Sequence, residues 1–148
     1  MNSITTHWMD DNERGAVLVE FALVLPLLLV LFAGMFDLGL AFQRYQAVTN
    51  AAREGARMAV LPGYSTAEVE SRVRDYLAAS GVPGTPTIVV SQITMTPVDT
   101  LFTLKKVHVQ VPHVFTLLGP IAAMVGGTFG TVQLTSESVM RVEVSGGG

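Results

Sequence analysis

The sequence predicts an α+β fold, in which a long, kinked N-terminal helix crosses a membrane once and precedes a short helix and a small antiparallel sheet. Three observations indicate this fold. Residues 16–36 are apolar, contain Glu20 as their only formal charge and are long enough to cross a bilayer. A helix-start motif follows at residues 65–68. Beyond Pro86, apolar and polar residues alternate with period two, as they do in half-buried strands.

The long helix is expected to run from about Ala16 to Val60. Pro26 lies inside it and removes one backbone hydrogen bond, which predicts a kink that a membrane helix tolerates. No strong stop signal comes before Leu61, Pro62 and Gly63. At ~1.5 Å per residue the helix would be roughly 65 Å long, so about half of it would project beyond the membrane. Residues 1–14 are polar and lack an apolar periodicity, which favours a leader or tail.

Small side chains recur at every fourth residue of the projecting half of this helix and predict a face for close packing. They are Ala47, Ala51, Gly55 and Ala59, with Ala52 and Ala56 beside them. Two partners fit such a face: the protein's own sheet, or a neighbouring subunit. The two can also occupy different sides of the helix.

The remaining chain predicts a small head. Ser65 and Glu68 form a capping box, and the helix after it presents apolar residues at helical spacing and ends before Gly81. These apolar residues are Val69, Val73, Tyr76 and Leu77. Period-two alternation predicts two strands. In the first, Val107, Val109 and Val111 alternate with Lys106, His108 and Gln110. In the second, the residues of one face are Val132, Leu134, Met140, Val142 and Val144, and those of the opposite face are Gln133, Glu137, Arg141 and Glu143. Residues 87–96 are rich in β-branched residues and predict a third strand.

Residues 114–130 are apolar but interrupted by glycines and by Pro120. The stretch is too short for a second membrane span. We therefore expect a buried or membrane-near loop between two strands.

Composition excludes several functional classes. The net charge is −3 and lysine and arginine form no cluster, which argues against nucleic-acid binding. The absence of cysteine excludes disulfides, thiolate metal sites, thiol nucleophiles and a lipid anchor on cysteine. No G-x-S-x-G motif is present, and the glycines at residues 126–130 lack the Lys-Ser/Thr of a phosphate loop. We expect no enzyme activity, no catalytic residue and no cofactor.

The three histidines do not predict a metal site. His7, His108 and His113 lack the i, i+4 spacing that places two ligands on one helix face. His108 falls on the polar side of a predicted strand. All three are therefore expected to be solvated or loop histidines.

Glu20 is the one chemically unusual residue of the apolar run. An unpaired carboxylate in the membrane is costly, so it is expected either to find a partner, to reach the headgroups or to be protonated. The residues alone leave these alternatives open.

Residues 15–21 resemble the processing site of Flp-type prepilins, in which a glycine precedes four mostly apolar residues, a glutamate and an aromatic residue. The residues that carry this resemblance are Gly15, Ala16, Val17, Leu18, Val19, Glu20 and Phe21, with Phe21 where Flp pilins usually carry tyrosine. The longer run of residues 14–26, together with residues 49–57, is similar to the TadE-like family of minor pseudopilins in tight-adherence secretion systems. Residues 138–143 are similar to the family's C-terminal strand, more weakly.

The resemblance implies a leader peptide over residues 1–15, a transmembrane segment over 16–36 and an extracytoplasmic pilin-like head over 37–148 that includes the second half of the long helix. A prepilin peptidase would cut between Gly15 and Ala16. The product would be a minor pseudopilin that takes part in assembly of a type IV pilus-like Flp pilus for cell adhesion, either within the fibre or only in starting it. It would sit in the bacterial inner membrane, with the head outside the cytoplasm, beside other pilins, minor pseudopilins and the inner-membrane assembly platform.

If Gly15 is removed, Ala16 gains a charged amine, and Glu20 lies four residues along on the same helix face. Glu20 can then partly compensate the amine of its own subunit. In a bundle of staggered helices it can instead pair with the Ala16 amine of a neighbouring subunit, which would make the register of assembly selective. The alternative is that Glu20 serves only recognition by the peptidase.

Two other classes of protein remain open. The first is a single-span envelope protein that binds a partner through its head and never polymerises. The second is a secreted protein cut by signal peptidase, which is disfavoured because no A-x-A site follows the apolar run. Arg14 before the span and Arg44 after it leave orientation undecided by charge, so a cytoplasmic N-terminus follows only from the resemblance.

Overall fold

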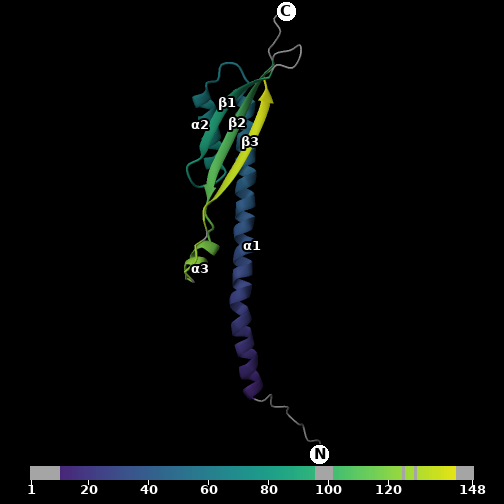
Figure 1. Ribbon diagram of the computed structural model, residues 1–148, viewed down its shortest axis with the longest axis vertical. Helices are drawn as coiled ribbons and strands as arrows, with labels where there is room; N and C mark the ends of the chain where they lie inside the picture. The colour runs from purple at the N-terminus through teal and green to yellow at the C-terminus, as the bar shows by residue number, and fades with distance from the viewer. Residues whose placement is uncertain (1–10, 96–101, 125, 129, 143–148) are drawn as a thin grey trace, which may run out of the picture.

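The computed structural model describes residues 11–95, 102–124, 126–128 and 130–142. Predictions for residues 1–10 with His7, for Thr96 at a strand end, and for Glu143 and Val144 lie outside these residues. The described part is an elongated molecule in which one long helix carries a small head at its C-terminal half (Figure 1). The predicted α+β class is confirmed.

Helix α1 spans Asp11–Ala59 and is the axis of the molecule. It is continuous through Pro26 and bows gently in Figure 1. A single missing hydrogen bond is thus absorbed by slight bending. The helix begins before Ala16, at Asp11. The predicted start of the long helix at about Ala16 was therefore too late.

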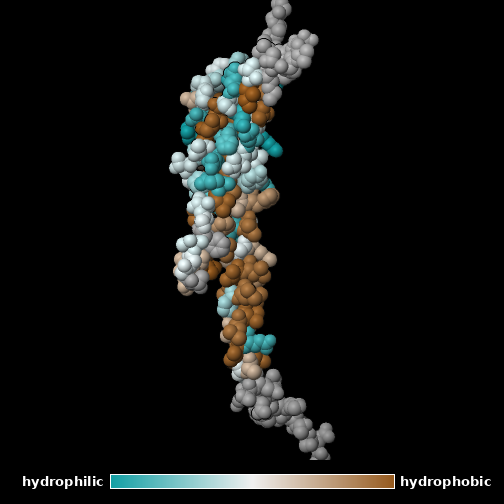
Figure 2. Space-filling view, viewed as in Figure 1, coloured by the Kyte–Doolittle hydropathy of each residue, from teal (hydrophilic) through white to brown (hydrophobic). Residues whose placement is uncertain are grey.

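Residues 15–32 of α1 are exposed and, apart from Glu20, mostly apolar (Figure 2). Among the described residues, one helix is long and apolar enough to cross a membrane, over residues 15–59 of α1. Only 6% of its most apolar 18-residue stretch is buried, unlike the core helix of a soluble protein. The chain therefore has the form of a single-pass membrane protein.

Three antiparallel strands form the sheet in the order β1-β2-β3: β1 Thr87–Met95, β2 Phe102–His113 and β3 Val132–Arg141. Val109 of β2 lies opposite Ile88 of β1 and Ser136 of β3. The predicted alternation is confirmed, since Val107, Val109 and Val111 are buried while the residues between them are half-exposed. Helix α1 packs against β2 and β3, and α2 packs against α1 and β1, so both helices cover the same face.

Helix α2 spans Thr66–Ala79 and starts with the predicted capping box. The backbone N–H of Ser65 donates to Glu68 Oε2 at 2.8 Å, and the Glu68 N–H donates to Ser65 Oγ at 3.3 Å. Gly81 follows the helix with φ +68°, a left-handed conformation that glycine adopts without strain. Val69, Val73 and Leu77 are buried in the core. The sequence motif therefore placed both ends of α2 and its buried face.

The segment between β2 and β3 contains a helix, α3, over Leu118–Met124, which lies beside α1 on the N-terminal side of the sheet (Figure 1). The expectation of a loop was wrong here. Pro120 sits in the first turn of α3, where its missing N–H would find no intrahelical partner in any case.

Candidate functional site

The predicted processing residues lie on the free half of α1. Gly15 and Ala16 are exposed, and a Cβ added at Gly15 would meet no atom within 4 Å. Glu20 is exposed on the same helix, about 6 Å further along and on the face of Ala16. Within the described residues, Glu20 forms no ion pair or hydrogen bond with its own chain. Its pairing with a group of another subunit stays a prediction.

The predicted packing face lies at the opposite end of α1, inside the head. Ala51 and Gly55 are buried, while Ala47 and Ala59 are partly buried against the core. A Cβ added at Gly55 would lie 2.6 Å from Val73 Cγ2 of α2. These small residues therefore allow the sheet and α2 of the same chain to approach α1 closely. A contact of this face with another subunit stays a prediction.

The structure adds a buried polar cluster at the junction of the apolar run and the head. Asp37 is the residue directly after the apolar run, and only 1% of its surface is exposed. Its Oδ1 accepts from the N–H of Thr116 at 3.0 Å and of Leu117 at 3.2 Å. Its Oδ2 accepts from the N–H of Leu117 at 3.0 Å and of Leu118 at 2.8 Å. One carboxylate thus satisfies the free N–H groups at the start of α3 and ties this helix to α1.

Arg44 and His113 form the second part of this cluster. Arg44 Nη1 lies 2.9 Å from His113 Nδ1. Because arginine can only donate, Nδ1 must be the acceptor, and the imidazole proton is on Nε2. His113 is 1% exposed, and its Nε2 has no hydrogen-bond partner among the described residues. Its ring meets Phe115 edge-on, with centroids 5.4 Å apart. The expectation of a solvated or loop histidine was wrong for His113.

The sequence contains signals for the burial of His113 and for the position of Asp37. His113 continues the period-two series of Val107, Val109 and Val111, so it lies on the buried face of β2. Asp37 precedes Arg44 by seven residues, which puts both on one face of α1. Neither pattern predicts the residue that His113 or Asp37 contacts, because each partner lies on a different element.

The free energy of unfolding is expected to fall as the pH is lowered, because His113 is buried in its neutral form. Burial lowers its pKa, the Arg44 charge lowers it further, and the Asp37 carboxylate opposes this in part. Between this lowered value and the unfolded value near 6.5, the unfolded chain binds a proton that the folded chain does not. The free energy of unfolding should therefore decrease as the pH falls from 7.5 through 6.5 and below.

Thermal unfolding of the full chain in detergent, measured from pH 7.5 to 5.5, checks this expectation. The slope of stability against pH should flatten in His113→Gln and persist in His108→Gln, which alters the polar side of β2. An unchanged slope in His113→Gln would assign the effect to another group.

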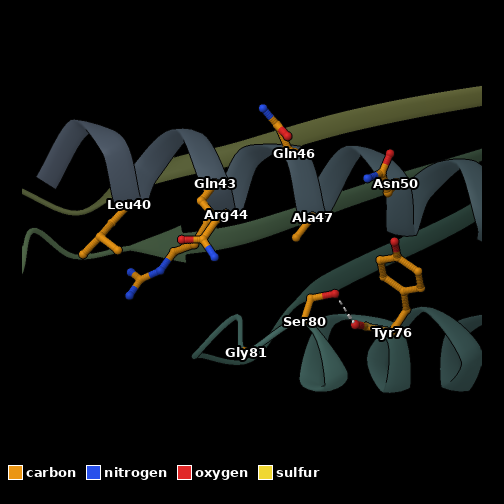
Figure 3. A pocket seen from close by; sticks show the side chains of 9 residues that line it. All are labelled: Leu40, Gln43, Arg44, Gln46, Ala47, Asn50, Tyr76, Ser80 and Gly81. Atoms are coloured by element: carbon orange, nitrogen blue, oxygen red, sulfur yellow. Dashed lines mark hydrogen bonds between the residues drawn. The ribbon is translucent and has the colours of Figure 1, made fainter. Parts of the chain in front are cut away.

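Two hollows border Arg44. One, of about 310 Å³, lies between α1 and the end of α2 and is lined by Leu40, Gln43, Arg44, Gln46, Ala47, Asn50, Tyr76, Ser80 and Gly81. Figure 3 shows Tyr76 pointing from α2 toward Asn50, and Arg44 directed to the side where α2 ends. The other, of about 350 Å³, lies against Pro83, Gly84 and Pro112. Within the described ranges, no three histidine or acidic side chains gather as metal ligands would.

Comparison with known families decides what this helix resembles. Residues 15–57 match the family model for TadE-like protein. The match confirms the resemblance predicted from residues 14–26 and 49–57. It covers less than a third of the chain and lies wholly on α1. No curated protein and no solved structure gives a match.

The TadE-like match runs from the residue before the predicted cleavage to the last turn of α1. It therefore includes Glu20, Asp37, Arg44 and Gly55 but none of their partners in the head. The sheet, α2 and α3 lie outside it.

Proposed function

We propose that this chain is a minor pseudopilin that takes part in assembly of a tight-adherence, Flp-type pilus after a prepilin peptidase removes residues 1–15. The observation that carries the proposal is the TadE-like match on a helix whose first half is apolar and exposed. A helix of that kind suits a membrane before assembly and a bundle of helices afterwards. The role is structural, with no enzymatic step assigned to this chain.

In this proposal α1 anchors the precursor in the bacterial inner membrane, and the head lies outside the cytoplasm. The partners are the prepilin peptidase, other pilins and minor pseudopilins, and the inner-membrane assembly platform. The head is firmly joined to α1 through Gly55 and Asp37. A subunit that moves out of the membrane would therefore carry its head as one body.

Replacement of Gly15 by valine is expected to leave the leader attached. A Cβ at this position would meet no atom of the subunit within 4 Å. In this proposal glycine is needed for the peptidase instead, because a side chain here would crowd its site and the bare backbone can enter it. Mass spectrometry of protein extracted from membranes checks the result: wild type should lose residues 1–15, and Gly15→Val should not. Gly34→Val, a matched change in the same helix, should be trimmed normally.

The same measurement separates the alternative function, a single-span envelope protein that binds a partner through its head. An intact wild-type chain would favour that alternative and contradict the pseudopilin proposal. Trimming of Gly15→Val at the same bond would show that Gly15 does not specify the cut.

Replacement of Glu20 by leucine is expected to leave trimming intact and to reduce recovery of the protein with its pilin partners. Glu20 forms no ion pair within the described part of the chain, and the new Ala16 amine lies one helical turn away. In a bundle of staggered helices, each of these charges needs a partner, since the medium there is apolar.

Trimming and co-purification should be measured together for Glu20→Leu and Glu20→Gln. The glutamine variant keeps the shape but not the charge, so it should behave like leucine. Normal co-assembly of a trimmed Glu20→Leu protein would refute the pairing role, and loss of trimming would assign Glu20 to peptidase recognition instead.

A further inference from the structure

Residues 114–124, here called the α3 segment, expose apolar side chains on a part of the chain without charge. No acidic or basic residue occurs from residue 114 to residue 136. Val114, Leu117 and Met124 are exposed, and Met124 is 88% exposed. A loop that faces water between two strands needs no such composition.

The position of the α3 segment matches the end of the membrane span. Asp37, which holds the start of α3, directly follows the apolar residues 16–36. Figure 1 shows α3 beside α1 on the side of the sheet that faces the N-terminus. Ala33, one turn before Asp37, is 6% exposed, whereas the adjacent Phe32 is 64% exposed. The segment therefore lies alongside the last turns of the span.

The backbone of α3 is paired at both ends, which an environment poor in water requires. Asp37 accepts from the N–H groups of residues 116–118 at its start. At its end, Gly127 donates to the carbonyl of Ala122 at 2.8 Å and Gly126 donates to that of Ala123 at 3.2 Å. Pro120 has no N–H to satisfy. In water, solvent would serve these groups without any such arrangement.

We propose that the α3 segment is a second membrane contact, in which Leu117 and Met124 insert into the head-side leaflet next to α1. The partner is lipid, because the exposed apolar side chains of Leu117 and Met124 belong to a segment that packs beside the apolar, exposed span of α1. The head is then held to the bilayer at two points, and its orientation relative to the membrane is fixed. The inference rests on α1 crossing the membrane, as the proposed function requires.

The chain contains no cysteine, so a single spin label can be placed by one substitution. Met124→Cys reports on the α3 segment, and Leu117→Cys repeats the measurement at a second position. Leu31→Cys, exposed on the apolar run, is the lipid control, and Val89→Cys, exposed on β1 and pointing away from the core face, is the aqueous control. Each full-length variant is reconstituted at one chain per phosphatidylcholine and phosphatidylglycerol nanodisc.

Collision of the label with oxygen, which concentrates in lipid, is compared with collision with a water-soluble nickel chelate. We expect the oxygen-to-nickel ratio at Met124 and Leu117 to exceed that at Val89 severalfold and to approach that at Leu31. Asp37→Ala in the Met124→Cys chain should return the ratio toward the aqueous value, because α3 is released from α1.

Three results would overturn the inference. A ratio at Met124 and Leu117 equal to that at Val89 places the segment in water. Shielding of both labels from oxygen and nickel places it against protein, for example against another part of this chain. If the labels at Leu31, Met124 and Leu117 all gave the aqueous ratio, the membrane span and the proposed function would be refuted. If Leu31 gave the lipid ratio while Met124 and Leu117 gave the aqueous ratio, only the α3 contact would be refuted.

Discussion

Gly55→Leu is expected to destabilise the head by about 3 kcal/mol, and Gly55→Ala by about 1 kcal/mol. Even the first carbon of either side chain would lie 2.6 Å from Val73 Cγ2 and 3.2 Å from Val107 Cγ1. Both valines are fully buried, and β-branched side chains have few alternative rotamers. Relief therefore requires α2 or β2 to move away from α1. Thermal unfolding of the full chain in detergent, followed by circular dichroism, measures the loss.

Gly39→Ala is the matched control, because it makes the same change in the same helix at an exposed position. A Cβ at Gly39 would meet nothing within 4 Å. Alanine there should be neutral or stabilise by about 0.5–1 kcal/mol through its higher helix propensity. If Gly55→Leu unfolded and assembled like wild type, the small-residue face would be free surface rather than a close contact.

Asp37→Ala is expected to cost about 3 kcal/mol and to release α3 from α1. The substitution removes a carboxylate that accepts four hydrogen bonds, and it leaves the N–H groups of residues 116–118 without an acceptor. Hydrogen exchange at these three amides should accelerate more than exchange in β2, because the contact is local to α3.

Asp75→Ala is the control, since Asp75 is exposed on α2 and surface substitutions of this kind change stability little. Asp37→Asn should fall between wild type and alanine. Its amide oxygen can accept some of the bonds, but its NH₂ group would face backbone donors. Unchanged exchange at residues 116–118 in Asp37→Ala would show that these amides find other partners and that Asp37 does not hold α3.

Much of the fold follows from local patterns. The capping box at Ser65 and Glu68 predicted the start of α2, and Gly81 predicted its end, because these motifs act through hydrogen bonds a few residues apart. Alternation predicted which residues of β2 face the core. A loop was wrongly expected in place of α3, whose start depends on a carboxylate 79 to 81 residues earlier in the chain.

The sequence by itself determined the long apolar helix, the strands and the TadE-like residues of α1, since periodicity and motifs need no distant partner. Gly15 and Glu20 were likewise found from the motif, and their roles stay predictions. Only the tertiary structure decided that Gly55 faces Val73, that His113 is buried against Arg44, and that Asp37 begins α3. Each of these contacts joins separate elements, so it exists only after the sheet and α3 have docked onto α1 and excluded water from the groups between them.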